Sequence, residues 1–305
     1  MSAKMYKKPQ NMYNPKKSSP FKRLLIYLMG MKKVTMPLYV KVFYILNIGS
    51  KLMRVPILGT IYKRVLLYDP SENAYSHSTV LNLNVDVSED QKQCVLPIDL
   101  VKKVINDAEI IASTPFCICR QGKKTDREKY PQDVCCLFFS DLAKTGIKNG
   151  VAYEISKEKA LERVDKAAKS GLVAQALWVQ LEQYLWGVQD MHGFFEICFC
   201  CPCCCVAINN TRYGQRYIKE HFTSSGWQAI VNDNCIKCGE CISVCPQEAI
   251  TMNGNSLKIN NDYCFGCAIC KTECKNKAIE IKQVKPMKNN LLDYFKDEGK
   301  IELHI

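Results

Sequence analysis

The 305-residue chain contains 19 cysteines, and its 42 lysines and arginines outnumber its 30 acidic residues. It is too long for a disulfide-stapled miniprotein and, at 47 % hydrophobic residues, too apolar for a disordered tail. The first 68 residues contain 14 Lys or Arg and no acidic residue, whereas the rest of the chain holds 28 basic and 30 acidic residues. The charge thus separates a basic N-terminal segment from a near-neutral, cysteine-rich remainder that is long enough for two or three small domains.

The basic segment has two parts. Residues 1–20 are polar and contain three prolines, which predicts a flexible arm. Residues 21–68 alternate short apolar runs with single or paired cations, which predicts a basic amphipathic helical segment. The longest uncharged run, Val42–Ser50, has nine residues, and a membrane-spanning helix needs roughly 18. We therefore expect no conventional transmembrane helix and, without a small-residue cleavage site, no secretory signal peptide.

Residues 69–223 are predicted to form a cysteine-rich α/β domain. Pro97 and apolar residues at three- and four-residue spacing predict a helix over 96–113. Ser156 as N-cap and Gly171 as the stop predict a second helix between them. A strand is expected at 194–200 and a helix at 212–223, followed by a linker at 224–226. A separate small domain should span 228–283, and the tail 284–305 is charged.

The cysteines are clustered in a way that favours metal binding over disulfides. Two thiolates at Cys-x-x-Cys spacing can face one ion or cluster. A disulfide framework would instead require an oxidising compartment, and the odd number of cysteines would leave one unpaired. The pattern therefore predicts a reducing cytoplasm, in an anaerobic or oxygen-avoiding cell.

The most specific motif is an internal repeat of 29 residues. Four cysteines with the spacing C-x2-C-x2-C-x3-C recur after 29 positions with the same spacing, and Ala249-Ile250 recurs as Ala278-Ile279. The first set is Cys235, Cys238, Cys241 and Cys245, and the second is Cys264, Cys267, Cys270 and Cys274. This block resembles the bacterial two-cluster ferredoxin domain. Zinc sites with four cysteines also use C-x2-C, but they do not require the 2-2-3 spacing twice.

The resemblance implies two 4Fe–4S clusters with crossed ligation. Cys235, Cys238, Cys241 and Cys274 would hold one cluster, and Cys264, Cys267, Cys270 and Cys245 would hold the other. Asn253-Gly254 between the halves indicates a hairpin. Lys275 departs from the pattern because Pro246 follows the fourth cysteine of the first set. The expected fold is α+β, with two short hairpins and two short helices around the clusters after a mainly helical, cysteine-rich N-terminal region.

Ten further cysteines lie upstream, in the segments CICR, DVCCLFF and EICFCCPCCC. This combination resembles an iron–sulfur protein family of anaerobic bacteria and archaea in which such segments precede a ferredoxin domain. We hypothesise a third cluster or other metal site built from Cys117, Cys119, Cys136, Cys200, Cys201, Cys203 and Cys204, with Cys135, Cys198 and Cys205 as further candidates. The alternative is that several are buried as small hydrophobes.

Other residues near these segments have less specific roles. Arg120 is either a hydrogen-bond donor to a cluster sulfide or an anionic substrate, or an exposed surface residue. His192 is expected to be structural, and Trp178, Trp186 and Trp227 are expected in the core or an interface. No role is assigned to Cys94.

The function predicted from these motifs is single-electron transfer to a partner redox enzyme or to the upstream site. The alternative is a reductase or activase whose upstream cysteines hold a further cluster or a substrate site fed by the ferredoxin domain. No radical C-x3-C-x2-C motif, phosphate loop or clear dinucleotide fingerprint is present, which favours the carrier. For residues 21–68, peripheral membrane contact, docking to an acidic redox partner and an ordinary solvated helical subdomain all remain open, while nucleic-acid binding is not expected.

Overall fold

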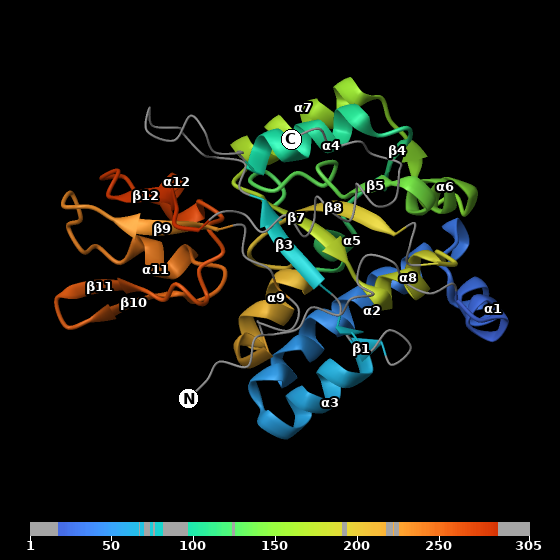
Figure 1. The fold of residues 1–305 in the computed structure, drawn as a ribbon, viewed down its shortest axis with the longest axis horizontal. Coiled ribbons are helices and arrows are strands. Elements are labelled where there is room, and N and C mark those ends of the chain that lie inside the picture. Colours follow the sequence, from blue (N-terminus) through green and yellow to red (C-terminus); the bar gives the residue numbers. More distant parts are fainter. Residues whose placement is uncertain are drawn as a thin grey trace.

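The computed structural model describes residues 18–66, 68–69, 74–75, 77–81, 97–123, 126–190, 194–217, 222 and 226–285. Two parts are visible in Figure 1: a larger body, residues 18–217, and a small C-terminal unit, residues 226–285. Nearly all of the predicted arm and tail lie outside the described residues, as do Cys94, His192 and two residues of the predicted linker.

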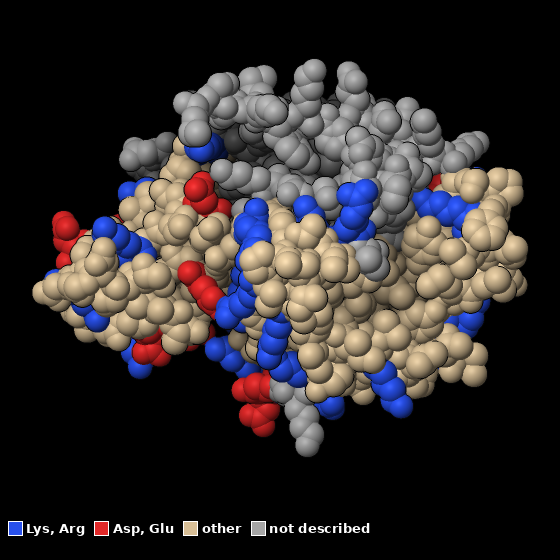
Figure 2. Space-filling model, turned by 90° about the horizontal axis from the view of Figure 1, so that it is seen from below, with Lys and Arg blue, Asp and Glu red and all other residues tan. Residues whose placement is uncertain are grey.

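Three helices form the basic segment, as the sequence predicted. They are α1 (Pro20–Met29), α2 (Met36–Gly49) and α3 (Pro56–Leu66), joined by the 3-10 turns η1 (Lys33–Thr35) and η2 (Ser50–Arg54). A proline in each first turn needs no hydrogen-bond donor there and presets a helical φ. None of the described helices is long and apolar enough to cross a membrane. Figure 2 views the molecule from the side of these helices.

The body contains a six-stranded antiparallel sheet in the order β3 (His77–Leu81), β7 (Val173–Trp178), β8 (Phe195–Cys200), β5 (Leu137–Phe139), β4 (Ile111–Ser113) and β6 (Tyr153–Glu154). A separate pair joins β1 (Tyr68–Asp69) to β2 (Ala74–Tyr75). The region is helix-rich as expected, but because the sheet is antiparallel the fold is α+β rather than α/β. The strand at 194–200 is confirmed as β8.

Two predicted helices differ from the structure. The helix expected over 96–113 ends at Asp107 as α4 (Pro97–Asp107), and Ile111–Ser113 instead form β4. Strand β4 pairs with β5 and β6 at once, and this tertiary pairing outweighs the local helical spacing. The helix expected at 212–223 begins earlier, as α9 (Val206–Tyr213), and ends before Gly214, followed by η5 (Gln215–Tyr217).

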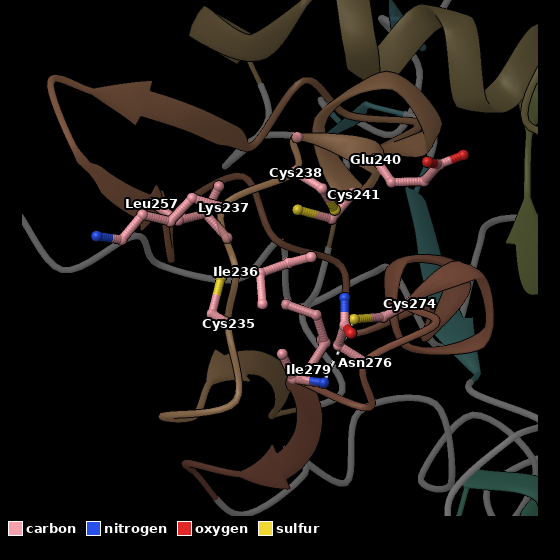
Figure 3. A pocket seen from close by; sticks show the side chains of 12 residues that line it. Cys235, Ile236, Lys237, Cys238, Glu240, Cys241, Leu257, Cys274, Asn276 and Ile279 are labelled. Carbon is pink, nitrogen blue, oxygen red and sulfur yellow. Dashed lines mark hydrogen bonds between the residues drawn. The ribbon is translucent and has the colours of Figure 1, made fainter.

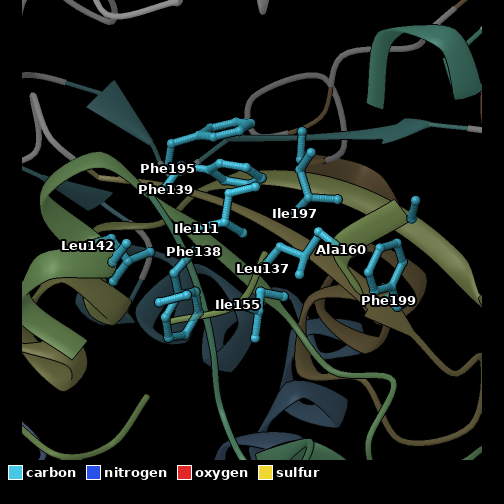
Figure 4. Close-up of a cluster of buried hydrophobic side chains, with 14 of the residues drawn as sticks. Ile111, Leu137, Phe138, Phe139, Leu142, Ile155, Ala160, Phe195, Ile197 and Phe199 are labelled. Carbon is cyan, nitrogen blue, oxygen red and sulfur yellow. The ribbon is translucent and has the colours of Figure 1, made fainter. Parts of the chain in front are cut away.

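Helices cover both faces of the sheet. In Figure 1, α4 and α7 (Lys157–Lys169) lie on one side, while α2 and α8 (Gln180–Trp186) lie on the other. α7 has the predicted Ser156 cap and ends near Gly171, whose φ is +64°. The remaining helices are α5 (Ile118–Gly122) and α6 (Ser140–Lys148). The shared core, seen in part in Figure 4, includes Phe138, Phe139, Phe199 and Ile197.

The C-terminal unit contains β9 (Trp227–Val231), α11 (Glu240–Val244), β10 (Ile250–Asn253), β11 (Ser256–Ile259), α12 (Ile269–Glu273) and β12 (Ile279–Gln283). β10 and β11 form the hairpin predicted at Asn253-Gly254. The second expected hairpin is wrong: β9 pairs with β12, so this pair joins the two ends of the unit. Trp227, the first residue of β9, is fully buried, as predicted for a core residue.

Candidate iron–sulfur centres and the upstream thiol cluster

The 29-residue repeat of the sequence is also a repeat of backbone conformation. Helix α12 follows α11 by 29 positions at both ends. Positive φ angles recur with the same offset, at Lys237 and Gly266, at Gly239 and Ala268, and at Glu248 and Lys277. Left-handed residues between closely spaced cysteines turn the chain sharply, which lets successive Sγ atoms face the same space.

The turn after the fourth cysteine is the same in both halves. The Sγ atom of Cys245 accepts a hydrogen bond from the Ala249 amide, and that of Cys274 accepts one from Ala278, both at 3.3 Å. Lys275 therefore leaves this turn unchanged where the first half has Pro246. An N–H donor to sulfur stabilises the thiolate form, the form that binds metal.

Four cysteines from both halves of the repeat surround one pocket. It is lined by Cys235, Cys238 and Cys241 of the first set and by Cys274 of the second (Figure 3). Burial raises the pKa of Cys241, and the neighbouring Cys235, Cys238 and Cys274 raise it further. Cys238 is exposed at the surface of this pocket.

The second set of four lies deeper. Cys270 interacts electrostatically with Cys267, Cys264 and Cys245. As in the first group, three cysteines of one set meet the fourth cysteine of the other. Burial raises the pKa of Cys267 to about 12 and also raises those of Cys264 and Cys270. Cys270 is buried and the other three are partly buried. Four thiolates held this close repel one another, so this donor set fits a cationic iron–sulfur core that neutralises them.

Two crossed groups of four thiols define a ferredoxin-type iron–sulfur domain. In agreement, residues 234–278 match the family model for the 4Fe-4S dicluster domain. The match covers the C-terminal unit and not the upstream cysteines. No curated protein and no solved structure matches the chain.

The body forms hydrogen bonds to the C-terminal unit beside Cys245. The Arg212 guanidinium donates to the carbonyls of Pro246 and Pro202, so one side chain joins the turn after Cys245 to the segment CCPCCC. Gln247, 1 % exposed, donates through Nε2 to the Ile208 carbonyl and the Thr211 hydroxyl at 3.3 and 3.1 Å. The second thiol group is thus held against α9 and its preceding turn.

Three upstream elements bring four thiols together. Cys117 and Cys119 lie at the start of α5, Cys200 ends β8, and Cys205 caps α9. Cys119 interacts with both Cys117 and Cys205, and Cys205 interacts with Cys200. Cys205 was absent from the main predicted ligand set, because six cysteines in eight residues give no indication of which side chains point together.

The other predicted upstream ligands form separate groups. Cys136 is in bonding contact with Cys198 beside Glu196, and Cys201 is in bonding contact with Cys204 beside Cys203. The structure pairs these four cysteines as two disulfides, whereas their spacing in the sequence favoured metal binding. The three donor atoms of each group also lie within 4.8 Å of one another, a separation that suits one metal ion. The buried Cys135 thiol donates to the Thr114 carbonyl at 2.9 Å, as a packed thiol would.

Arg120 is not a surface residue. Its side chain is fully buried, and it donates to the carbonyls of Phe199 and Val134, which corrects the alternative of an exposed arginine. Its Nε has no hydrogen-bond partner among the described residues. Trp186 packs against Phe43 and Phe138 in the core as predicted, and the side chain of Trp178 lies outside the described part.

Proposed function

We propose that the protein is a one-electron relay whose C-terminal domain holds two 4Fe–4S clusters. The first would be bound by Cys235, Cys238, Cys241 and Cys274, and the second by Cys264, Cys267, Cys270 and Cys245. The observation that carries this proposal is the pocket in which three cysteines of one repeat meet the fourth of the other. The family match supports iron–sulfur electron transfer as the general activity. When bound, such clusters supply single-electron chemistry without proton transfer.

The protein's own residues would contribute the cluster ligands, hydrogen-bond donors to sulfur, and a difference in solvent exposure between the two cysteine groups. Ala249 and Ala278 place an amide on the fourth thiolate of each set. Cys238 opens the first group to solvent, next to Ile236, which is 67 % exposed. In the second group, Cys267 packs against the apolar cluster that α12 shares with the body. We infer that a redox partner docks at the first group, in the cytoplasm.

The test is anaerobic iron and acid-labile sulfide analysis of the full chain, with EPR after reduction. We expect at least about eight irons per chain, four for each cubane. Cys235→Ser with Cys238→Ser should remove about four irons and one set of EPR features. A chain that binds zinc and no iron under these conditions would refute the proposal.

A further inference from the structure

Four upstream thiols converge although they come from two segments far apart in sequence, residues 117–119 and residues 200–205. Cys117, Cys200 and Cys205 are each less than 9 % exposed, and Cys119 links Cys117 to Cys205. A single turn cannot produce this arrangement, because α5, β8 and α9 must all pack before the thiols meet. Four convergent sulfur donors are the composition of an iron–sulfur or zinc site.

Hydrogen bonds from α5 and its C-cap hold this segment against β8 and the turn before α9. The Arg120 guanidinium donates to the Phe199 carbonyl at 3.0 Å, next to Cys200, and the Lys123 ammonium donates to the Cys203 carbonyl at 2.7 Å. Arg120 is fully buried near Cys117, and its Nε has no hydrogen-bond partner among the described residues. A buried guanidinium at this position favours a negatively charged group beside it. The Cys135 thiol, by contrast, donates to the Thr114 carbonyl at 2.9 Å, as a packed thiol would.

The cluster also adjoins the ferredoxin-type domain. Cys200 and Cys205 share an apolar cluster with Phe265 and Ile269, and Cys267 packs against the same cluster. Phe265 stacks on Phe222 with ring centroids 4.0 Å apart, and Phe222 packs against the same cluster. The second cysteine set and the upstream thiols therefore meet through one apolar cluster.

We propose that Cys117, Cys119, Cys200 and Cys205 bind a third iron–sulfur centre, placed as the internal acceptor of the two-cluster domain. A low-potential one-electron donor protein would reduce the domain from its exposed side. One electron would then leave the second cluster, which is reoxidised, and enter the upstream centre, which is reduced, with no bond made and no proton moved. The acceptor role depends on the proposed function, whereas the metal site depends only on the contacts among the four thiols.

The experiment compares three full-length chains purified and reconstituted anaerobically with iron and sulfide: wild type, Cys117→Ser/Cys119→Ser, and Cys135→Ser as a matched control. Wild type should bind more than the about eight irons of two cubanes. The double variant should lose the excess and keep the ferredoxin EPR features, which also reports that it has folded. The Cys135 variant should keep all of its iron. A second double variant, Cys200→Ser/Cys205→Ser, should match the first.

Each alternative outcome is decisive. A wild type with no more than about eight irons, or an excess that survives both double variants, overturns the third centre. Zinc in place of the excess iron overturns its redox role. A wild type that shows no ferredoxin EPR features would instead contradict the proposed function. The iron lost in the two double variants would then still test the upstream centre.

A second inference rests on an independent feature, the outer face of α1, α2 and α3. Of 21 exposed large hydrophobic residues among the described residues, 16 lie between Phe21 and Ile61. Examples are Phe21 at 76 %, Val34 at 85 % and Ile57 at 75 % exposed. An apolar area of this extent is unusual on a protein surface that faces only water.

The charge around this face selects its occupant. Every ionisable side chain through Tyr68 that carries formal charge is Lys or Arg. In Figure 2 a broad uncharged area lies over the helices with Lys and Arg mainly along its margins, whereas Asp and Glu gather mostly toward the C-terminal unit. Apolar side chains ringed by cations fit the headgroup region of an anionic bilayer. The longest of the three helices, α2, has 14 residues, which suits lying in the interface.

We propose that α1–α3 bind the surface of an anionic membrane and hold the redox domain beside it. The test is flotation of the full chain with vesicles of phosphatidylcholine alone or mixed with phosphatidylglycerol. The chain should float with the mixed vesicles, and Leu38→Glu/Ile45→Glu should reduce the floated fraction at least about tenfold, which corresponds to about 1.4 kcal/mol. The control Met252→Glu, on an exposed strand of the C-terminal domain, should float like wild type.

Two results would overturn this assignment. One is wild type that stays unbound to both vesicles, or a double variant that floats undiminished. The other is a wild-type dimer in solution that Leu38→Glu/Ile45→Glu converts to monomer without changing flotation, because the face would then be a contact between two copies.

Discussion

Gly266 offers the sharpest test of how the C-terminal unit is built. Its φ is +63°, and a Cβ placed there would lie 2.1 Å from the Trp227 carbonyl oxygen and 2.6 Å from its carbon. Both are backbone atoms of β9, so no rotamer change can relieve the contact. At the equivalent position of the first repeat, Lys237 carries a full side chain at φ 61°. The left-handed backbone alone therefore does not require glycine here; the approach of β9 does.

The magnitude of Gly266→Ala follows from two contributions. A left-handed alanine costs about 1–2 kcal/mol, and an overpacked contact adds about 1–3 kcal/mol. Gly239→Ala is the matched control, because its φ is +80° but a new Cβ would meet nothing within 4 Å. It should show only the first contribution. The difference between the two variants, about 1–3 kcal/mol, measures the contact with β9.

The assay is the urea midpoint for anaerobic bleaching of the iron–sulfur absorbance in the full chain, with iron content measured beforehand. Gly266→Ala should bleach at clearly lower urea than Gly239→Ala, and Gly239→Ala only slightly below wild type. Equal midpoints for the two glycine variants would refute the argument, since both share the same backbone conformation and differ only in what surrounds the new methyl group.

Three further predictions concern the junction, the second turn and a buried acid pair. Gln247→Ala should destabilise the chain by about 1–3 kcal/mol, because it removes a buried Nε2 donor that bonds both the Ile208 carbonyl and the Thr211 hydroxyl of α9. Arg54→Ala breaks an exposed ion pair to Glu248 at 2.8 Å and should cost less than about 1 kcal/mol in the same urea titration. Equal losses would contradict this ranking. Lys275→Pro should raise stability by about 0.4–1 kcal/mol, because Cys274 already has a φ of −80° and ψ of 100° that a following proline accepts; a loss of cluster would show that the turn needs the amide. Burial raises the pKa of Glu196, and the Glu182 carboxyl raises it further, so the folded state keeps a proton that the unfolded state releases above about pH 4.3. Stability should therefore fall as pH rises above that value, and Glu196→Gln should gain on wild type between about pH 5 and pH 8 in urea titrations; parallel pH profiles would exclude the effect.

The sequence predicted the C-terminal unit well because its spacing acts locally. Each cysteine set lies within eleven residues, and the turns between them depend on a few left-handed positions. The hairpin at Asn253-Gly254 was equally local. The pairing of β9 with β12 was missed because the two strands are about fifty residues apart, and no residue pattern in either strand identifies its partner.

The upstream site was only partly predictable for a related reason. The density of cysteines indicated a cluster, but Cys205 and Cys119 meet only after α5 packs against the turn before α9. The same limit applies to Arg120, whose burial depends on β8 and on the Val134 carbonyl rather than on its neighbours in sequence. Strand β4 shows the converse, since its local pattern favoured a helix and pairing on both sides made it a strand.

The two halves of the repeat share one backbone but present different surfaces. The loop that carries Ile236, Lys237 and Glu240 faces water, while its counterpart carries Phe265, Gly266 and Ile269 and faces the body. One copy of the duplicated loop is thus adapted to solvent, and the other is adapted to contact with the body. Rotating the domain by its internal pseudo-symmetry would bury Lys237 and Glu240 and expose Phe265. The two ends of the domain are therefore not interchangeable, and the proposed electron path would run from the first cysteine set to the second.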